Sequence, residues 1–171
     1  MRKERVLTDD FELRAISLSA VPEALAKAER YRLLNQPDEA ESICRDILDV
    51  EPGHQPALTM LVLALSDQFG HKETMGNFRE ATQVAAKLED NYERLYYGGI
   101  ARERAARAML TAMSRAYAYD GFREAMDWYE EALPLRPAGD DNAILRWNSC
   151  VRAIRKHNLR PRVDEGELPL E

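Results

Sequence analysis

The sequence has little of several residue types, and each shortage excludes a class of protein. Its only cysteines, Cys44 and Cys150, are too few for a disulfide framework or a cysteine-rich zinc site, so we expect reduced, buried thiols. With 8 glycines and 8 prolines, collagen-like and extended low-complexity chains are excluded. No stretch approaches the roughly 18 apolar residues of a membrane span, and no apolar segment follows the charged first residues. We therefore expect no membrane association and a cytoplasmic protein.

Charge and composition narrow the choice further. The chain carries 24 Lys and Arg against 30 Asp and Glu, a net charge of −6, which argues against a generally basic nucleic-acid binder. Alanine, leucine, glutamate and arginine dominate, and consecutive β-branched residues are almost absent, which favours helix nearly everywhere. A length of 171 residues is close to one domain and allows a substantial core. The sequence predicts an all-α domain.

A short motif recurs along the chain. FREA occurs at 78–81 and 122–125, and the related DEA occurs at 38–40. When the copies are aligned on Ala40, Ala81 and Ala125, further small or apolar residues follow at spacings of four and three, which is one face of a helix. Pro52 and Pro137 lie twelve residues after the first and third alanines, where each would end a helix. Because another amphipathic stretch precedes each copy, each unit is predicted to be a helical hairpin.

This pattern resembles the tetratricopeptide repeat (TPR) family, whose 34-residue unit has a small residue at position 8, an aromatic residue at 11, alanine at 20 and proline at 32. Segment 21–54 has Ala28, Tyr31, Ala40 and Pro52 at these positions. The resemblance implies a right-handed α-solenoid of antiparallel helical hairpins. It divides the chain into an N-terminal segment 1–20 with a possible short helix, repeats at 21–54, 55–105 (extended) and 106–139, a capping helix at 140–157, and a disordered tail at 158–171.

The second repeat departs from the family pattern. Ala81 comes seven residues later than the period allows, which predicts a long loop or an extended helix within 68–77. Ten more residues accumulate within 89–105. That segment contains Gly98 and Gly99, which are unfavourable inside a helix, and we expect them to mark close helix packing or a kink. The alternative is a ligand held against exposed backbone between Tyr96 and Tyr97.

Motifs for catalysis are absent from the sequence. It contains no HExxH, CxxC, GxSxG or phosphate-binding glycine loop, and no pair of carboxylates stands out. His54, His71 and His157 are expected on the surface. We predict a non-enzymatic protein with no cofactor and no metal. An enzyme on a helical scaffold is the least favoured alternative, and its candidate residues are Tyr96, Tyr97, Glu103 and Arg104.

In the TPR family, the first helix of each hairpin lines a concave groove, so the resemblance implies a protein-protein interaction module that binds a peptide or protein segment there. The residues at the groove positions of this chain are Leu25, Glu29, Arg32, Thr59, Leu63, Ser66, Arg107, Leu110, Ser114, Tyr117, Asn148 and Arg152. Chaperone-binding members hold a C-terminal carboxylate with lysine and asparagine in the first repeat. Leu25 and Glu29 occupy those positions here, so that specificity is not expected.

One charged segment bears on the choice of partner. Between Arg146 and Arg162 there are six Lys and Arg residues and no acid. Some of them complement the dipole at a helix C-terminus, and the alternative is a basic docking strip for an acidic partner or, less favoured, RNA. We expect a protein or peptide partner, which could carry an acidic segment. A self-associating scaffold that pairs through the groove or the inserted residues is the main alternative function.

Overall fold

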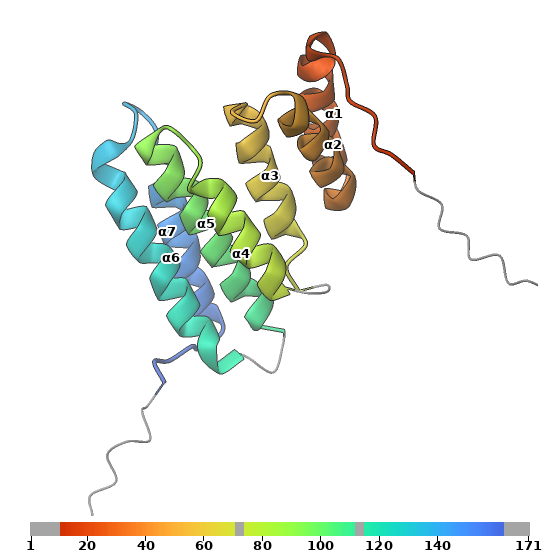
Figure 1. Cartoon of the computed structure of the whole chain (residues 1–171). Coiled ribbons are helices and arrows are strands. Elements are labelled where there is room, and N and C mark those ends of the chain that lie inside the picture. The colour runs from red at the N-terminus through yellow and green to blue at the C-terminus, as the bar shows by residue number, and fades with distance from the viewer. Residues whose placement is uncertain (1–10, 71–73, 112–114, 163–171) are drawn as a thin grey trace, which may run out of the picture.

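The computed structural model of the chain describes residues 11–70, 74–111 and 115–162, and over these ranges the protein consists of helices and turns (Figure 1). No strand occurs in these ranges, so the predicted all-α class is confirmed for them. Short 3-10 turns lie at Leu18–Ala20, Arg115–Tyr117 and Leu133–Leu135. The α-helices are α1 (Val21–Leu33), α2 (Pro37–Val50), α3 (Gln55–Asp67), α4 (Thr74–Ala85), α5 (Asn91–Met109), α6 (Ala118–Ala132) and α7 (Asn142–Lys156).

Local sequence signals explain where several helices begin. A proline lies in the first turn of α1, α2 and α3, where its missing N–H breaks no helical hydrogen bond. The Asp90 carboxylate accepts from the Glu93 N–H at 2.8 Å and caps α5. The imidazole of His54 accepts from the Ala57 N–H at 3.1 Å, so this histidine caps α3. These starts are encoded within a few residues of each helix.

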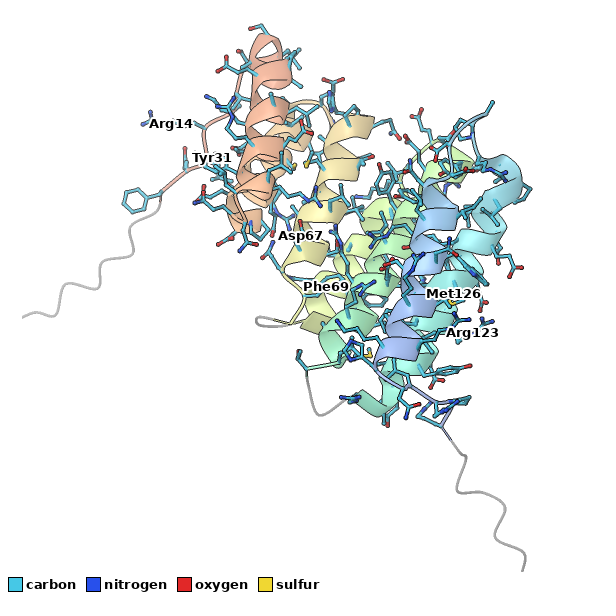
Figure 2. The ribbon with its side chains drawn as sticks, turned by 180° about the vertical axis from the view of Figure 1, so that it is seen from behind. Arg14, Tyr31, Asp67, Phe69, Arg123 and Met126 are labelled. Atoms are coloured by element: carbon cyan, nitrogen blue, oxygen red, sulfur yellow. The ribbon has the colours of Figure 1, made fainter. Side chains whose placement is uncertain are left out.

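The helices form two layers. Each helix packs against the next one in the chain, and α1, α3, α5 and α7 also contact one another in that order. By contrast, α2, α4 and α6 make few or no such contacts with one another. In Figure 1, α7 lies behind α6, and the opposite view of Figure 2 brings α7 to the front. We call α1, α3, α5 and α7 the odd layer, and α2, α4 and α6 the even layer.

The core lies between these layers, and the repeated alanines lie within it. Ala40, Ala81 and Ala125 are fully buried, in agreement with their predicted place on an inward helix face. Both cysteine thiols are also buried, as predicted. Small side chains at such positions let neighbouring helices approach closely. The apolar face predicted for each second helix is buried too, at Ala40, Cys44 and Ile47, at Ala81, Ala85 and Leu88, and at Ala125, Tyr129 and Ala132.

The predicted insertion in the second hairpin is divided between the linker and a helix. Six residues separate α3 from α4, whereas three separate α1 from α2. Ala81 is the eighth residue of α4, whereas Ala40 is the fourth residue of α2. The seven additional residues therefore lengthen both the linker and the start of α4.

The boundary predicted between the second and third repeats, at 105/106, falls inside α5, which begins at Asn91 and ends at Met109. The helix that pairs with α6 therefore begins six residues after the end of α4 at Ala85. Gly98 and Gly99, which were counted among the residues inserted within 89–105, lie inside this helix and pack against α6. The additional residues make α5 19 residues long, against 13 for α1 and α3.

The two ends of the described chain also differ from expectation. Residues 11–17 form no helix, and only the short turn at Leu18–Ala20 precedes α1. A helix, α7, lies within the range 140–157 predicted for a capping helix. The tail predicted to be disordered from residue 158 is ordered at its start, because Leu159 is buried in the core and Arg162 pairs with Asp120 at 2.6 Å. None of the helices in the described ranges is long and apolar enough to cross a membrane.

Candidate functional site

An ion-pair cluster on the odd layer connects α1, α3 and α5. Asp67 lies at the end of α3 (Figure 2). Its carboxylate accepts from Arg32 of α1 at 2.6 Å and from Arg104 of α5 at 2.7 Å. Arg104 also donates to the Ser66 hydroxyl at 2.8 Å and to the Leu63 carbonyl at 3.0 Å. One carboxylate therefore joins three helices of the odd layer.

A second cluster surrounds Glu103, whose side chain is fully buried in the middle of α5. Its carboxylate accepts from Arg107 at 2.8 Å, from Arg146 of α7 at 2.9 Å and from the Tyr129 hydroxyl of α6 at 2.8 Å. Arg107 also donates to the Ser149 hydroxyl of α7 at 2.7 Å. An unpaired buried carboxylate would cost several kcal/mol, so these donors are needed to keep Glu103 inside the fold.

The two clusters contain more positive than negative charge. Together they form what we call the arginine network, which consists of Arg32, Asp67, Glu103, Arg104, Arg107 and Arg146. Four guanidinium groups are held by two carboxylates. The side chains of Arg107 and Arg146 remain 39% and 32% exposed. Burial lowers the pKa of Arg104, with Asp67 acting in the opposite direction and Arg32 adding to the lowering. An anionic group that approached the network would therefore be attracted to partly desolvated positive charge.

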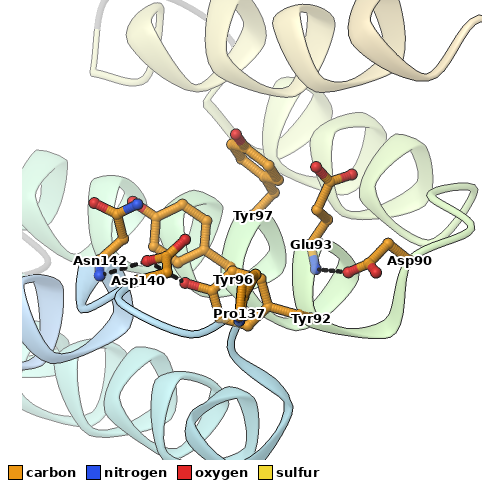
Figure 3. A pocket seen from close by; sticks show the side chains of 8 residues that line it. All are labelled: Asp90, Tyr92, Glu93, Tyr96, Tyr97, Pro137, Asp140 and Asn142. Atoms are coloured by element: carbon orange, nitrogen blue, oxygen red, sulfur yellow. Dashed lines mark hydrogen bonds between the residues drawn. The ribbon is translucent and has the colours of Figure 1, made fainter.

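Beside the network, a pocket of about 190 Å³ lies where the starts of α5 and α7 meet (Figure 3). The rings of Tyr92 and Tyr96 stack with centroids 5.8 Å apart, and Tyr97 meets Tyr96 edge to face at 5.1 Å. Burial is the main cause that raises the pKa of Tyr96 and of Tyr97. We call this the tyrosine pocket, and it is lined by Asp90, Tyr92, Glu93, Tyr96, Tyr97, Pro137, Asp140 and Asn142.

The carboxylates of the tyrosine pocket have different roles. Asp90 caps α5. Asp140 accepts from the Asn142 N–H at 2.8 Å and from the Tyr92 hydroxyl at 3.0 Å, and the Asn142 N–H is the main cause that lowers the pKa of Asp140. Glu93 makes no ion pair with any residue that the structure describes, and its carboxylate points the same way as Tyr97 in Figure 3. Glu93 is therefore the carboxylate left available to a bound group.

The glycine pair explains how α5 is positioned. A Cβ on Gly98 would lie 2.5 Å from Cζ3 of Trp128, and one on Gly99 would lie 2.6 Å from Cε1 of Tyr129. Close helix packing, the favoured interpretation of this pair, is therefore confirmed. The alternative of a ligand against bare backbone is wrong, because side chains of α6 cover both glycines. Arg102 lies over the outer face of Trp128 at 3.8 Å, which adds a cation-π contact to the α5–α6 interface.

The structure brings some of the predicted groove residues together. Arg32 and Arg107 belong to the arginine network, and Ser66 and the Leu63 backbone bind Arg104. Thr59 is half-buried one turn before Leu63 on α3.

Other predicted groove residues lie elsewhere. Leu25 packs into a small cluster at the N-terminal end, and Glu29 is exposed on α1. Leu110 follows the end of α5, and the ring of Tyr117 lies under Arg162 at 4.3 Å, away from the network. Ser114 lies outside the described residues, as does His71.

On α7 the residues of the arginine network differ from the predicted groove residues. Asn148 and Arg152 were expected in the groove, but the side chains of α7 that contact α5 through the network are those of Arg146 and Ser149. Glu103 and Arg104 of α5 were named above only as candidates for an enzyme and not as groove residues, although a signal for their place existed. Once α5 is taken to start at Asn91, residues 96, 100, 103 and 107 are three or four positions apart and therefore lie on one face of the helix.

The predicted basic strip is partly neutralised. Arg146 is paired with Glu103, and Arg162 is paired with Asp120. Arg152, Arg155 and Arg160 are exposed. The exposed positive charge of this segment therefore lies on α7 and just after it, outside the arginine network.

No protein-family model matches the chain, and neither the curated proteins nor the solved structures contain a match to it. The TPR resemblance thus rests on the residues that suggested it.

Proposed function

We propose that this protein is a non-enzymatic, TPR-like helical scaffold that binds an acidic polypeptide segment across its odd layer. The observation that carries the proposal is the excess of positive charge in the arginine network, where four arginines from three helices share two carboxylates. In a right-handed solenoid of this kind the odd helices would line the concave side, where a bound segment contacts several hairpins at once.

The extent of the network favours a polypeptide over a small anion. The network reaches from Arg32 on α1 to Arg146 on α7, with α3 and α5 between them. Packed helices lie about 8–10 Å apart, so the network covers about 20–30 Å. An extended peptide advances about 3.3 Å per residue and would need roughly six to nine residues to cover it. A segment of that length with one or two acidic side chains fits the charge balance.

Selection from an mRNA-displayed library of random peptides tests this proposal. We expect the peptides enriched on the wild-type protein to contain Asp or Glu, and the best of them to weaken about tenfold against the Arg107→Gln variant. Arg107 is the suitable position because Arg146 and the Tyr129 hydroxyl would still hold Glu103. The matched control is Arg155→Gln, which removes the same charge from an exposed side chain outside the network.

Two results would contradict the proposal. Enrichment without acidic residues would remove the assigned partner chemistry. An equal loss of affinity in the Arg155→Gln variant would show that general electrostatic attraction, rather than the network, holds the peptide. The circular dichroism spectra of the Arg107→Gln and Arg155→Gln variants must match that of the wild type, so that a loss of fold is not mistaken for a loss of binding.

A specific observation favours self-association as a second candidate function. Leu33 and Leu34, at the end of α1, are 76% and 62% exposed, which is unusual for neighbouring large apolar side chains. Sedimentation velocity over a wide concentration range tests this candidate. A dimer that dissociates on replacing both leucines by serine would support it, whereas a wild-type protein that stays monomeric would exclude it.

A further inference from the structure

The lining of the tyrosine pocket combines aromatic faces with negative charge. Tyr96 and Tyr97 present partly exposed rings, and Glu93 adds a carboxylate that is unpaired among the described residues. Aromatic faces attract cations through their quadrupole, and a neighbouring carboxylate strengthens that attraction. This lining suits a positively charged group and disfavours an anion.

Helix dipoles oppose this preference but do not reverse it. The N-termini of α5 and α7 both point toward the pocket, and each contributes about half a positive charge. Three carboxylates, those of Asp90, Glu93 and Asp140, line the same space. Counted over the lining carboxylates and the two helix N-termini, the balance is about two negative charges, so the lining itself favours a cation.

The arginines near the pocket are already engaged with other carboxylates. Arg146 is paired with Glu103, Arg32 with Asp67, and Arg136 with Asp141 at 3.7 Å. A side chain that left one of these pairs to enter the pocket would abandon its partner. A cation in the tyrosine pocket must therefore come from another molecule.

The distance from the pocket to the arginine network sets the spacing in such a partner. Tyr96 and Glu103 are seven residues apart on α5, which is about 10 Å along the helix. Three residues of an extended peptide cover about the same distance where the bound segment follows the direction of α5 between the two sites.

We infer that the tyrosine pocket takes a lysine or arginine side chain of the bound polypeptide, about three residues from the acidic side chain that the arginine network holds. This inference rests on the proposed function and gives the partner a second charge of opposite sign. The acidic group lies against Arg107 and Arg146, and the basic group lies against Tyr96, Tyr97 and Glu93. The two sites together also orient the segment, because reversing the chain would place each charge against a like charge.

The displayed library tests the inference directly. We expect enriched peptides to carry Lys or Arg two to four positions from Asp or Glu. In the best synthetic peptide, replacing the basic residue by norleucine should weaken binding to the wild-type protein about tenfold. The same replacement should cost less than threefold against the Glu93→Gln variant. The matched control is Glu89→Gln, an exposed acid just before α5 that does not line the pocket, and here the full loss should remain.

The outcomes separate this inference from the proposed function. Enriched peptides that are acidic and depend on Arg107 but carry no basic residue would overturn the pocket assignment and leave the proposed function standing. A norleucine effect of equal size in wild type and Glu93→Gln would place the basic residue elsewhere and would also overturn it. Peptides that lack acidic residues and ignore Arg107 would overturn the proposed function, and the inference with it.

Discussion

Replacing Gly99 by alanine should destabilise the protein, although alanine is the better helix former. Helix propensity alone would stabilise α5 by about 1 kcal/mol. The new Cβ, however, would lie 2.6, 2.9 and 3.1 Å from three ring atoms of Tyr129. Carbon atoms in favourable contact are about 3.5–4.0 Å apart, so the ring would have to move by about 1 Å.

The surroundings of Tyr129 set the size of the effect. The ring is fully buried, and its hydroxyl donates to the buried Glu103 carboxylate at 2.8 Å. Overpacking costs about 1–3 kcal/mol, and a lost hydrogen bond to a buried charged group costs about 1–3 kcal/mol more. After the helix-propensity gain is subtracted, Gly99→Ala should lower the free energy of unfolding by about 3 kcal/mol. For a chain of this size, Tm would fall by about 6–12 °C.

Urea denaturation followed by far-UV circular dichroism measures this change. Gly53→Ala is the control, because a Cβ at that position meets nothing within 4 Å, and its stability should stay the same or rise by about 0.4–1 kcal/mol. In a Tyr129→Leu background, where the ring is absent, Gly99→Ala should lower the free energy of unfolding by less than it does in the wild type. A Gly99→Ala protein as stable as the wild type would refute the close-packing argument, since the sign of the change then follows helix propensity alone.

Further tests concern the core and the Asp140 carboxylate just before α7. Ala125→Glu should lower the free energy of unfolding by about 3–5 kcal/mol, because it buries an unpaired charge at a fully buried position, and an unchanged Tm would contradict this. Burial raises the pKa of Cys44 and of Cys150 to about 12, so both thiols should resist a thiol reagent at pH 8 until urea unfolds the chain. The lowered pKa of Asp140 stabilises the fold above about pH 4, and this contribution is lost as the pH falls through the folded-state pKa. Urea titrations between pH 6 and pH 2 should therefore show a weaker pH dependence for Asp140→Asn than for the wild type.

The arginine network has a structural consequence that does not depend on any partner. Glu103 receives hydrogen bonds from α5, α6 and α7, and Asp67 receives them from α1 and α5. Removing either carboxylate would leave two arginines facing each other without compensation. The network therefore couples the hairpins to one another. Because loss of a carboxylate would disturb this coupling, the arginines are the suitable positions for a binding test.

Much of the helix pattern could be predicted from the sequence, because its signals are local. The spacing of four and three after Ala40 and Ala125 correctly identified the buried faces of α2 and α6. The start of α3 at Gln55 agrees with the repeat boundary predicted at 54/55. The start of α5 was missed, because two adjacent glycines are unfavourable in an isolated helix and become favourable only when Trp128 and Tyr129 fill the space beside them.

The candidate site could not be predicted in the same way. Arg32 and Arg107 were expected in the groove, but nothing in the sequence paired Arg32 with Asp67, 35 residues away, or Arg146 with Glu103, 43 residues away. The tyrosine pocket likewise needs the starts of α5 and α7 side by side. The sequence by itself determined most of the helical segments and the faces they bury, because both follow from residues three or four positions apart. Only the tertiary structure decided which charges meet, because an ion pair depends on how helices pack and has no signature at any fixed spacing in the chain.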